Sequence, residues 1–174
     1  RTLSTNTYYD YAGENTGTGG NLKTTTYGNN DSVSYFYDEL DRLIRKEYTG
    51  GRYVTYTYNA EGQLAKLTYG DGENEVASYL FEYDSLGRLV RSSEANGSGT
   101  IMQRTEHIYD EYSRLKRQSW ALGSKSYSEA YTYNDGTNET GNLATMTTGT
   151  GDVLNYTYDP LKRLQKVTVK DGNT

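Results

Sequence analysis

The sequence Tyr-Asp-Ser-Leu-Gly-Arg-Leu at residues 83–89 decides how the whole chain is interpreted. Aromatic side chains occupy every second position of residues 79–83, and this alternation is typical of a β-strand with one packed face. Asp84 and Gly87 fall at the first and fourth positions of a turn, where a type I turn favours these residue types. The Arg-Leu pair then opens a return strand, so the stretch predicts a β-hairpin.

The hairpin pattern recurs along the whole chain, with its Tyr at positions 9, 37, 58, 83, 109, 133 and 158. Five copies place the Leu six residues after the Tyr, whereas two have longer tips, at residues 10–21 and 134–142. A period of this length is the signature of repeat proteins, in which each unit packs on its neighbours. We expect one array of about seven repeats, bounded roughly at 1–26, 27–48, 49–70, 71–93, 94–120, 121–147 and 148–174.

Each position of the motif has a structural role that its chemistry explains. The Asp or Asn is expected to accept hydrogen bonds from backbone N–H groups of its turn. The Leu residues are expected to form one buried row beside the Tyr row, and the Arg residues to pair with neighbouring acids on the opposite face. The residues assigned to the motif are Tyr37, Asp38, Arg42, Leu43, Tyr58, Asn59, Gly62, Leu64, Tyr83, Asp84, Gly87, Arg88, Leu89, Tyr109, Asp110, Arg114, Leu115, Tyr133, Leu143, Tyr158, Asp159, Arg163 and Leu164.

Two irregularities carry structural predictions. Asp41, Ser113 and Lys162 replace the turn Gly, so those tips are expected to be slightly strained or differently turned. The return strands carry apolar residues three apart, as at Leu64 and Leu67, which predicts a β-bulge.

The composition limits the classes of function. The 18 Lys and Arg residues against 23 Asp and Glu give a net charge of −5, which argues against nucleic-acid binding. No apolar run is long enough for membrane insertion, and residues 1–7 lack the apolar region of a signal peptide. The 20 Tyr residues explain how a chain with a mean hydropathy of −0.91 can still bury surface.

The motif resembles the YD repeat, also called the Rhs repeat, whose core is Tyr-Asp-x-x-Gly-Arg-Leu. The resemblance covers residues 8–168. It implies secreted or cell-surface giant proteins, such as bacterial Rhs and wall-associated polymorphic toxins, the BC component of Tc toxins, and teneurins. In those families the strands form a hollow β-shell that can enclose a toxin domain. Such shells need many more repeats, so we expect a segment of a longer polypeptide.

Other candidate sites have simpler structural explanations. His107 takes the place of a ring in the aromatic row, and no partners for a catalytic triad or a zinc site are evident. The acidic loop at residues 70–75 lacks the ligand series of a calcium-binding loop. Asp159 and Pro160 suit a turn better than a self-cleavage site. We therefore predict no catalytic residue, no metal and no cofactor.

The fold predicted from the sequence is all-β, with tandem antiparallel hairpins forming a curved sheet that is part of a shell. The predicted function is a non-catalytic structural scaffold in a toxin-delivery or adhesion protein. Its expected partners are flanking segments of the same polypeptide and an enclosed toxin domain. Unpaired edge strands at the two ends also predict edge-to-edge self-association. The alternative is a carbohydrate- or ligand-binding module that uses exposed Tyr and the long tips; the cargo and the subclass stay open.

Overall fold

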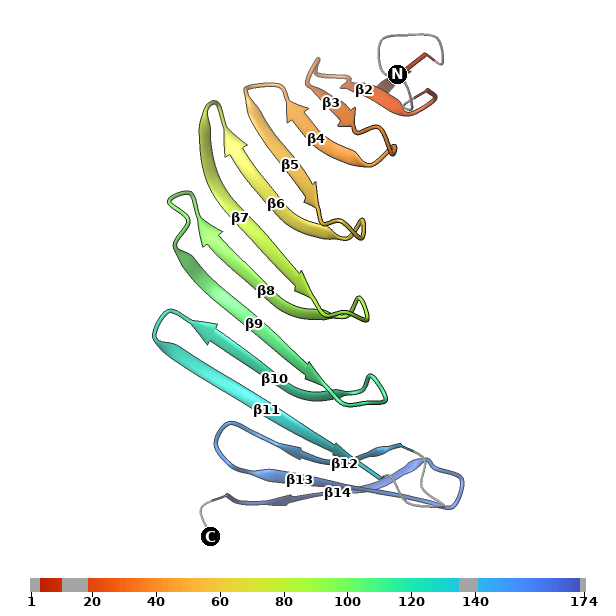
Figure 1. The fold of residues 1–174 in the computed structure, drawn as a ribbon, viewed down its shortest axis with the longest axis vertical. Helices are drawn as coiled ribbons and strands as arrows, with labels where there is room; N and C mark the ends of the chain where they lie inside the picture. Colours follow the sequence, from red (N-terminus) through yellow and green to blue (C-terminus); the bar gives the residue numbers. More distant parts are fainter. Residues whose placement is uncertain (1–3, 11–18, 135–140, 173–174) are drawn as a thin grey trace. The chain divides into compact units, whose positions relative to one another are not determined.

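The computed structural model describes residues 4–10, 19–134 and 141–172, which form a 14-stranded antiparallel sheet whose strands follow one another in chain order (Figure 1). Every element in this part of the chain is a strand or a turn, and no helix there could cross a membrane. The prediction of an all-β array of antiparallel hairpins is confirmed.

The chain divides into two compact units, residues 1–82 with 93–102 and residues 83–92 with 103–174. The first unit contains β1 to β6 and most of β7. The second contains most of β9 and all of β10 to β14, and β8 is shared between the units. The strands are β1 (Ser4–Tyr8), β2 (Leu22–Tyr27), β3 (Ser32–Tyr37), β4 (Leu43–Tyr48), β5 (Arg52–Tyr58), β6 (Leu64–Asp71), β7 (Asn74–Tyr83), β8 (Leu89–Asn96), β9 (Ile101–Tyr109), β10 (Leu115–Leu122), β11 (Lys125–Tyr133), β12 (Leu143–Thr147), β13 (Val153–Tyr158) and β14 (Leu164–Lys170).

The bulge lies immediately after the turn, on the return strand. In the β5–β6 hairpin Tyr58 pairs with Leu64 and Thr57 pairs with Lys66, so Ala65 has no partner residue opposite it. Register shifts occur at the same place in the β3–β4 and β13–β14 hairpins. The predicted bulge is confirmed, and it resets the alternation of the return strand after the turn.

The five short tips adopt the same turn whether or not Gly is present. Gly62 and Gly87 have φ values of 82° and 78°, in the left-handed region that Gly enters without steric cost. Asp41, Ser113 and Lys162 occupy the same position with φ values of 60°, 64° and 66°. Those three tips are therefore strained rather than differently turned, at roughly 1–2 kcal/mol each.

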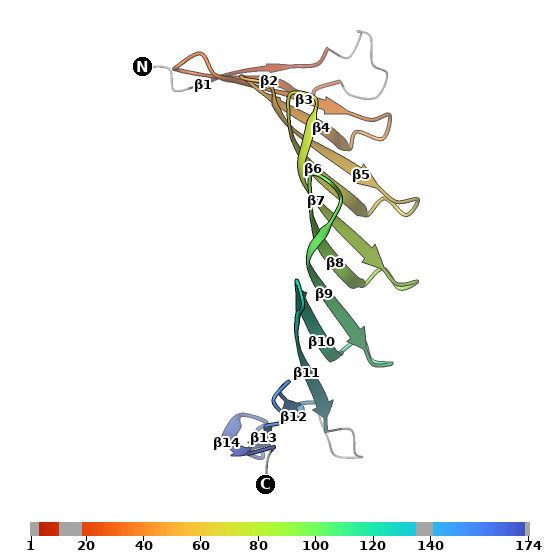
Figure 2. The same ribbon diagram turned by 90° about the vertical axis from the view of Figure 1, so that its left-hand side faces the viewer.

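The hydrophobic core is thin. Val33 and Val54 are buried at 6% exposure, but most of the motif's rings and Leu side chains are only half-buried. Figure 2 shows β3 to β6 of the first unit from the side, as a single layer (Figure 2). The expectation of a buried Leu row is wrong: Leu89 is half-buried and Leu164 is 57% exposed. The reason is that no second layer covers either face of these hairpins in the described residues.

A comparison of two Leu residues tests this description of the core. Leu89→Ala should lower the free energy of unfolding by about 1–2 kcal/mol, below the 2–5 kcal/mol typical of fully buried Leu. Leu164→Ala should cost less than about 0.5 kcal/mol because that side chain is already largely in water. Urea unfolding followed by circular dichroism gives both values, and equal losses would contradict the half-buried row.

Candidate functional site

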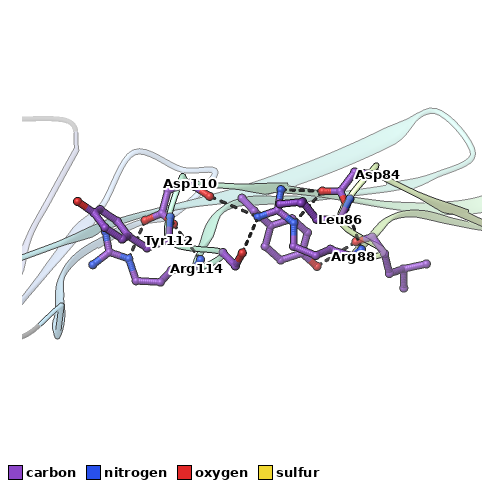
Figure 3. A network of polar contacts seen from close by, with 9 residues as sticks. Asp84, Leu86, Arg88, Asp110, Tyr112 and Arg114 are labelled. Carbon is purple, nitrogen blue, oxygen red and sulfur yellow. Dashed lines mark hydrogen bonds and ion pairs between the residues drawn. The ribbon is translucent and has the colours of Figure 1, made fainter.

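A turn carboxylate organises four of the five short tips. Asp84 Oδ1 accepts hydrogen bonds from the backbone N–H of Leu86 and of Arg88, both at 3.0 Å, and Oδ2 accepts from Arg88 Nε at 2.7 Å (Figure 3). One side chain therefore closes its own turn and fixes the direction of the Arg. Asp38, Asp110 and Asp159 make the same three bonds in their turns.

The Arg held in this way reaches the following hairpin. The Arg88 guanidinium carbon lies 4.6 Å from the centre of the Tyr109 ring, within the range of a cation–π interaction. The Tyr109 hydroxyl in turn donates to the Leu89 carbonyl oxygen at 2.9 Å. We call this set the clasp: the turn Asp, the Arg, the next hairpin's Tyr, and the Leu carbonyl group. Each clasp joins one hairpin to the next.

The clasp recurs with the same geometry. Arg114 lies over Tyr133 at 4.3 Å, and Tyr133 donates to the Leu115 carbonyl at 2.7 Å. In the first unit Arg42 lies 4.6 Å from the Tyr58 ring centre, and the Tyr58 hydroxyl donates to the Leu43 carbonyl at 2.8 Å.

Two positions show that the parts of the clasp are separable. Asn59 and Gln63 form a neutral version of the Asp–Arg pair, with Asn59 Nδ2 donating to Gln63 Oε1 at 3.1 Å. The Tyr158 hydroxyl donates to the Leu143 carbonyl at 2.9 Å, although Asn142 takes the place of the Arg before this Leu. The hydroxyl bond therefore forms without a stacked Arg.

The sequence did not reveal the stacking of Arg on the next Tyr. The joint replacement of Asp and Arg by Asn59 and Gln63 indicates only that these two positions interact with each other. A further unpredicted bond runs from Arg88 Nη1 to Ser113 Oγ at 3.1 Å. Ser113, which takes the strained position where other turns carry Gly, therefore accepts a hydrogen bond from the preceding hairpin.

The candidate catalytic and metal-binding residues do not assemble into a site in the described part of the chain. The His107 ring stacks beside Tyr109, with ring centres 6.3 Å apart and planes at 22°. No group of three His, Asp or Glu side chains there could hold a metal ion. Of the long tips, residues 11–18 and 135–140 lie outside the described residues.

Comparison with known proteins relates two stretches of the chain to a repeat family. The RHS Repeat family matches residues 37–73 and 138–174. The chain is also 27% identical over 157 residues to Probable deoxyribonuclease RhsB of Dickeya dadantii (strain 3937), covering 81% of this chain and 10% of that protein. These two stretches of the chain match the YD (Rhs) repeat. The clasp residues are thus the Tyr, Asp, Arg and Leu of the YD motif.

Solved structures share the fold of this YD-repeat chain. The crystal structure of TcdB2-TccC3-TEV superposes with a TM-score of 0.59 and 14% identity, over 86% of this chain and 10% of that one. TcdB2-TccC3 without its hypervariable C-terminal region gives 0.57 and 15%, over 88% and 8%. The chain therefore spans about a tenth of the length of the proteins that it matches.

Arg88 and Arg163 form a matched pair for measuring the stacking. Both bind their turn Asp, but the Arg88 side chain is 24% exposed over Tyr109, whereas the Arg163 side chain is 74% exposed. Arg88→Ala should lower the free energy of unfolding by about 1–2 kcal/mol through lost stacking and packing. Arg163→Ala should cost less than about 0.5 kcal/mol. Chemical unfolding measures both, and equal effects would show that the ring contact is not stabilising.

The turn acids predict a loss of stability in acid. The Arg88 side-chain hydrogen bond holds the pKa of Asp84 below its ordinary value, and the Arg163 backbone N–H does the same to the pKa of Asp159. A depressed folded-state pKa gives stability that is present above the unfolded pKa, about 3.9, and is lost as pH falls through the folded value. Asp84→Asn should therefore reduce the difference in urea midpoint between pH 7 and pH 3.

The neutral turn supplies the control for this measurement. Asn59→Ala removes the bond that the Gln63 backbone N–H donates to Asn59 Oδ1, without changing a titrating group. Its effect on the urea midpoint should therefore be the same at pH 7 and pH 3. A pH-independent effect of Asp84→Asn would contradict the electrostatic contribution of the clasp.

Proposed function

We propose that this chain is a non-catalytic wall segment of a larger secreted or cell-surface toxin-delivery or adhesion protein. The observation that carries the proposal is the clasp, because the polar residues of the motif are occupied in holding turns and joining neighbouring hairpins.

The clasp suits a wall because it depends only on adjacent repeats. Asp84 and Arg88 act within one hairpin, and Tyr109 and Leu89 connect that hairpin to the next. Stability in such an array is a sum of repeat and neighbour contributions, so the wall can be extended by adding hairpins. The proposed partners are accordingly flanking segments of the same polypeptide and a toxin domain that they enclose.

We propose that the deoxyribonuclease activity in the related protein's name resides outside the matched region. The matched stretch is 10% of that protein, which leaves ample chain for a separate nuclease domain. In the present chain Asp38, Asp84, Asp110 and Asp159 each bind the Arg of their own turn. These carboxylates are therefore poorly placed to hold the divalent cations that assist phosphodiester cleavage.

The second candidate function is carbohydrate binding, and one depression in the second unit favours it. Its lining includes Tyr112, Tyr131 and Arg114 among polar and aromatic groups. Tyr112 is 67% exposed, and the Arg114 guanidinium lies 4.9 Å from its ring centre. An exposed ring beside charged hydrogen-bonding groups is chemically suited to the apolar face and hydroxyls of a sugar.

Two assays on the isolated chain separate these functions. A wall segment should leave supercoiled plasmid DNA intact in the presence of Mg²⁺ and should give no signal on a glycan array. Glycan binding that disappears in Tyr112→Ala, with Leu86→Ala as an exposed control in a neighbouring tip, would favour the binding module. DNA cleavage by the purified chain would contradict the assignment as a non-catalytic segment.

The enclosing role itself is tested in the full-length polypeptide. Arg88→Ala and Arg114→Ala together should loosen the joints between hairpins and speed limited proteolysis of the domain that the wall encloses. Lys125→Ala, at the exposed start of β11, serves as the control and should leave the digestion rate unchanged. Equal digestion of all three proteins would contradict the enclosing role.

A further inference from the structure

Glu129 places a carboxylate at a position that is uncharged in every other repeat. It lies four residues before the motif residue Tyr133, and the residues at the same place in the other repeats are Thr5, Val33, Val54, Tyr79, Thr105 and Leu154. Val33 and Val54 are the buried core residues of their strands, at 6% exposure. A charge at such a position is costly unless a partner compensates it, and Glu129 is half-buried.

The register of the sheet provides an internal comparison for this position. In the first unit the directly paired residues Tyr35, Lys46 and Val54 form one row across β3, β4 and β5. The Lys46 ammonium nitrogen lies 5.7 Å from the centre of the Tyr35 ring and 5.9 Å from that of the Tyr56 ring, within the range of a cation–π interaction. The ring-bearing face of the sheet therefore holds a primary ammonium group of its own in this unit.

The equivalent row in the second unit carries a different set of charges. Its directly paired residues are His107, Gln118 and Glu129, on β9, β10 and β11. Gln118 takes the place of Lys46, three residues after the motif Leu. The row thus has an amide where the first unit has an ammonium group, and a carboxylate where the first unit has a Val.

Aromatic side chains flank the Glu129 carboxylate. The Tyr131 hydroxyl donates to Glu129 Oε2 at 2.6 Å, and the Tyr127 hydroxyl lies 3.5 Å from Oε1, at the limit of a hydrogen bond. Trp120 pairs with Tyr127 across the strands, and their ring centres are 5.6 Å apart. A carboxylate has about four acceptor sites, so capacity is left for a further donor.

Glu129 differs from the glutamates on the opposite face in its partners. There Glu47 pairs with Arg45 at 2.7 Å, and Glu106 pairs with Arg91 at 3.0 Å. Within residues 4–10, 19–134 and 141–172, Glu129 bonds to Tyr hydroxyls and pairs with no cation. Its negative charge is therefore not balanced by an ion pair, although aromatic rings with electron-rich faces lie beside it.

The aromatic wall of this cluster is accessible and fixed. Tyr127 is 42% exposed, so a ligand can reach its ring from solvent. The ring lies where a side chain on residue 149 would project, and a Cβ built on Gly149 would meet Tyr127 Cδ2 at 2.9 Å. A ring held over bare backbone needs little rearrangement when a ligand binds.

We propose that Glu129, with Tyr127, Tyr131 and Trp120, binds the primary alkylammonium group of a ligand. This is the chemistry of a lysine side chain and of a free aliphatic amine. The carboxylate balances the charge and accepts the N–H groups, while the rings contact the CH₂ groups and attract the cation. The inference goes beyond the role as a wall segment, because these side chains are not part of the clasp.

Trp120 is the only Trp of the chain, so its fluorescence reports directly on the cluster. n-Butylammonium chloride, exchanged for sodium chloride at constant ionic strength, should change the Trp120 emission saturably. Butan-1-ol, a neutral analogue of the same length, should give no such change. Glu129→Gln keeps an acceptor for the Tyr131 hydroxyl but removes the charge, so it should weaken binding of butylammonium roughly tenfold.

Glu106→Gln is the matched control, because it removes the same charge from the opposite face of the same unit. It should leave the affinity for butylammonium unchanged. The blocked tripeptide acetyl-Ala-Lys-Ala-amide, compared with its norleucine analogue, identifies the source of the ammonium group. Tighter binding of the Lys tripeptide than of butylammonium would indicate a lysine side chain, and tighter binding of butylammonium would indicate a free amine.

A second variant separates ligand binding from folding. Glu129→Val installs the residue found at positions 33 and 54, so it should abolish the fluorescence response and keep or raise the urea midpoint. A lowered midpoint would overturn the proposal by showing that Glu129 serves the fold. The proposal also fails if butylammonium gives no saturable response, if butan-1-ol gives an equal one, or if Glu129→Gln binds as tightly as the natural chain.

Discussion

The structure depends on the joint between one hairpin and the next, because the strands of β3 to β6 form a single layer without a covering second layer. A sandwich or barrel buries side chains between layers, whereas here each hairpin has neighbours only along the sheet. Arg88 over Tyr109, and the Tyr109 hydroxyl on the Leu89 carbonyl, supply the contact that a second layer would otherwise give. Tyr suits this task because its ring contributes apolar area while its hydroxyl stays hydrogen-bonded at a half-exposed position.

The turn and the joint are coupled through one carboxylate. Asp84 closes its turn through two backbone N–H groups and aims Arg88 at the next ring through its second oxygen atom. The local conformation of a tip therefore sets the contact between repeats, which explains how the same seven-residue motif can build an array of any length. The strained tips at Asp41 and Ser113, whose Arg residues still reach the next Tyr, show that this coupling tolerates the loss of Gly.

Two sets of positions in the same hairpin have different surroundings. The Tyr, Asp, Arg and Leu of the motif face their neighbours, whereas the residue two after the Asp points into solvent at 71% exposure in Leu86. One set of positions can thus hold the sheet together while the other varies without disturbing it. Glu61, at the same place in the β5–β6 tip, shows that the outward position is chemically independent of the fold.

The sequence by itself determined the strands, the turns and the bulge after Leu64, because each of these follows from local alternation and turn chemistry that repeat along the chain. Only the tertiary structure decided how deeply Leu89 is buried, which ring Arg88 contacts, and that Trp120 lies beside Tyr127. Those features depend on which strands become neighbours and on whether another layer covers them. A pattern with a period of two residues specifies one face of a strand but carries no information on what, if anything, lies against that face.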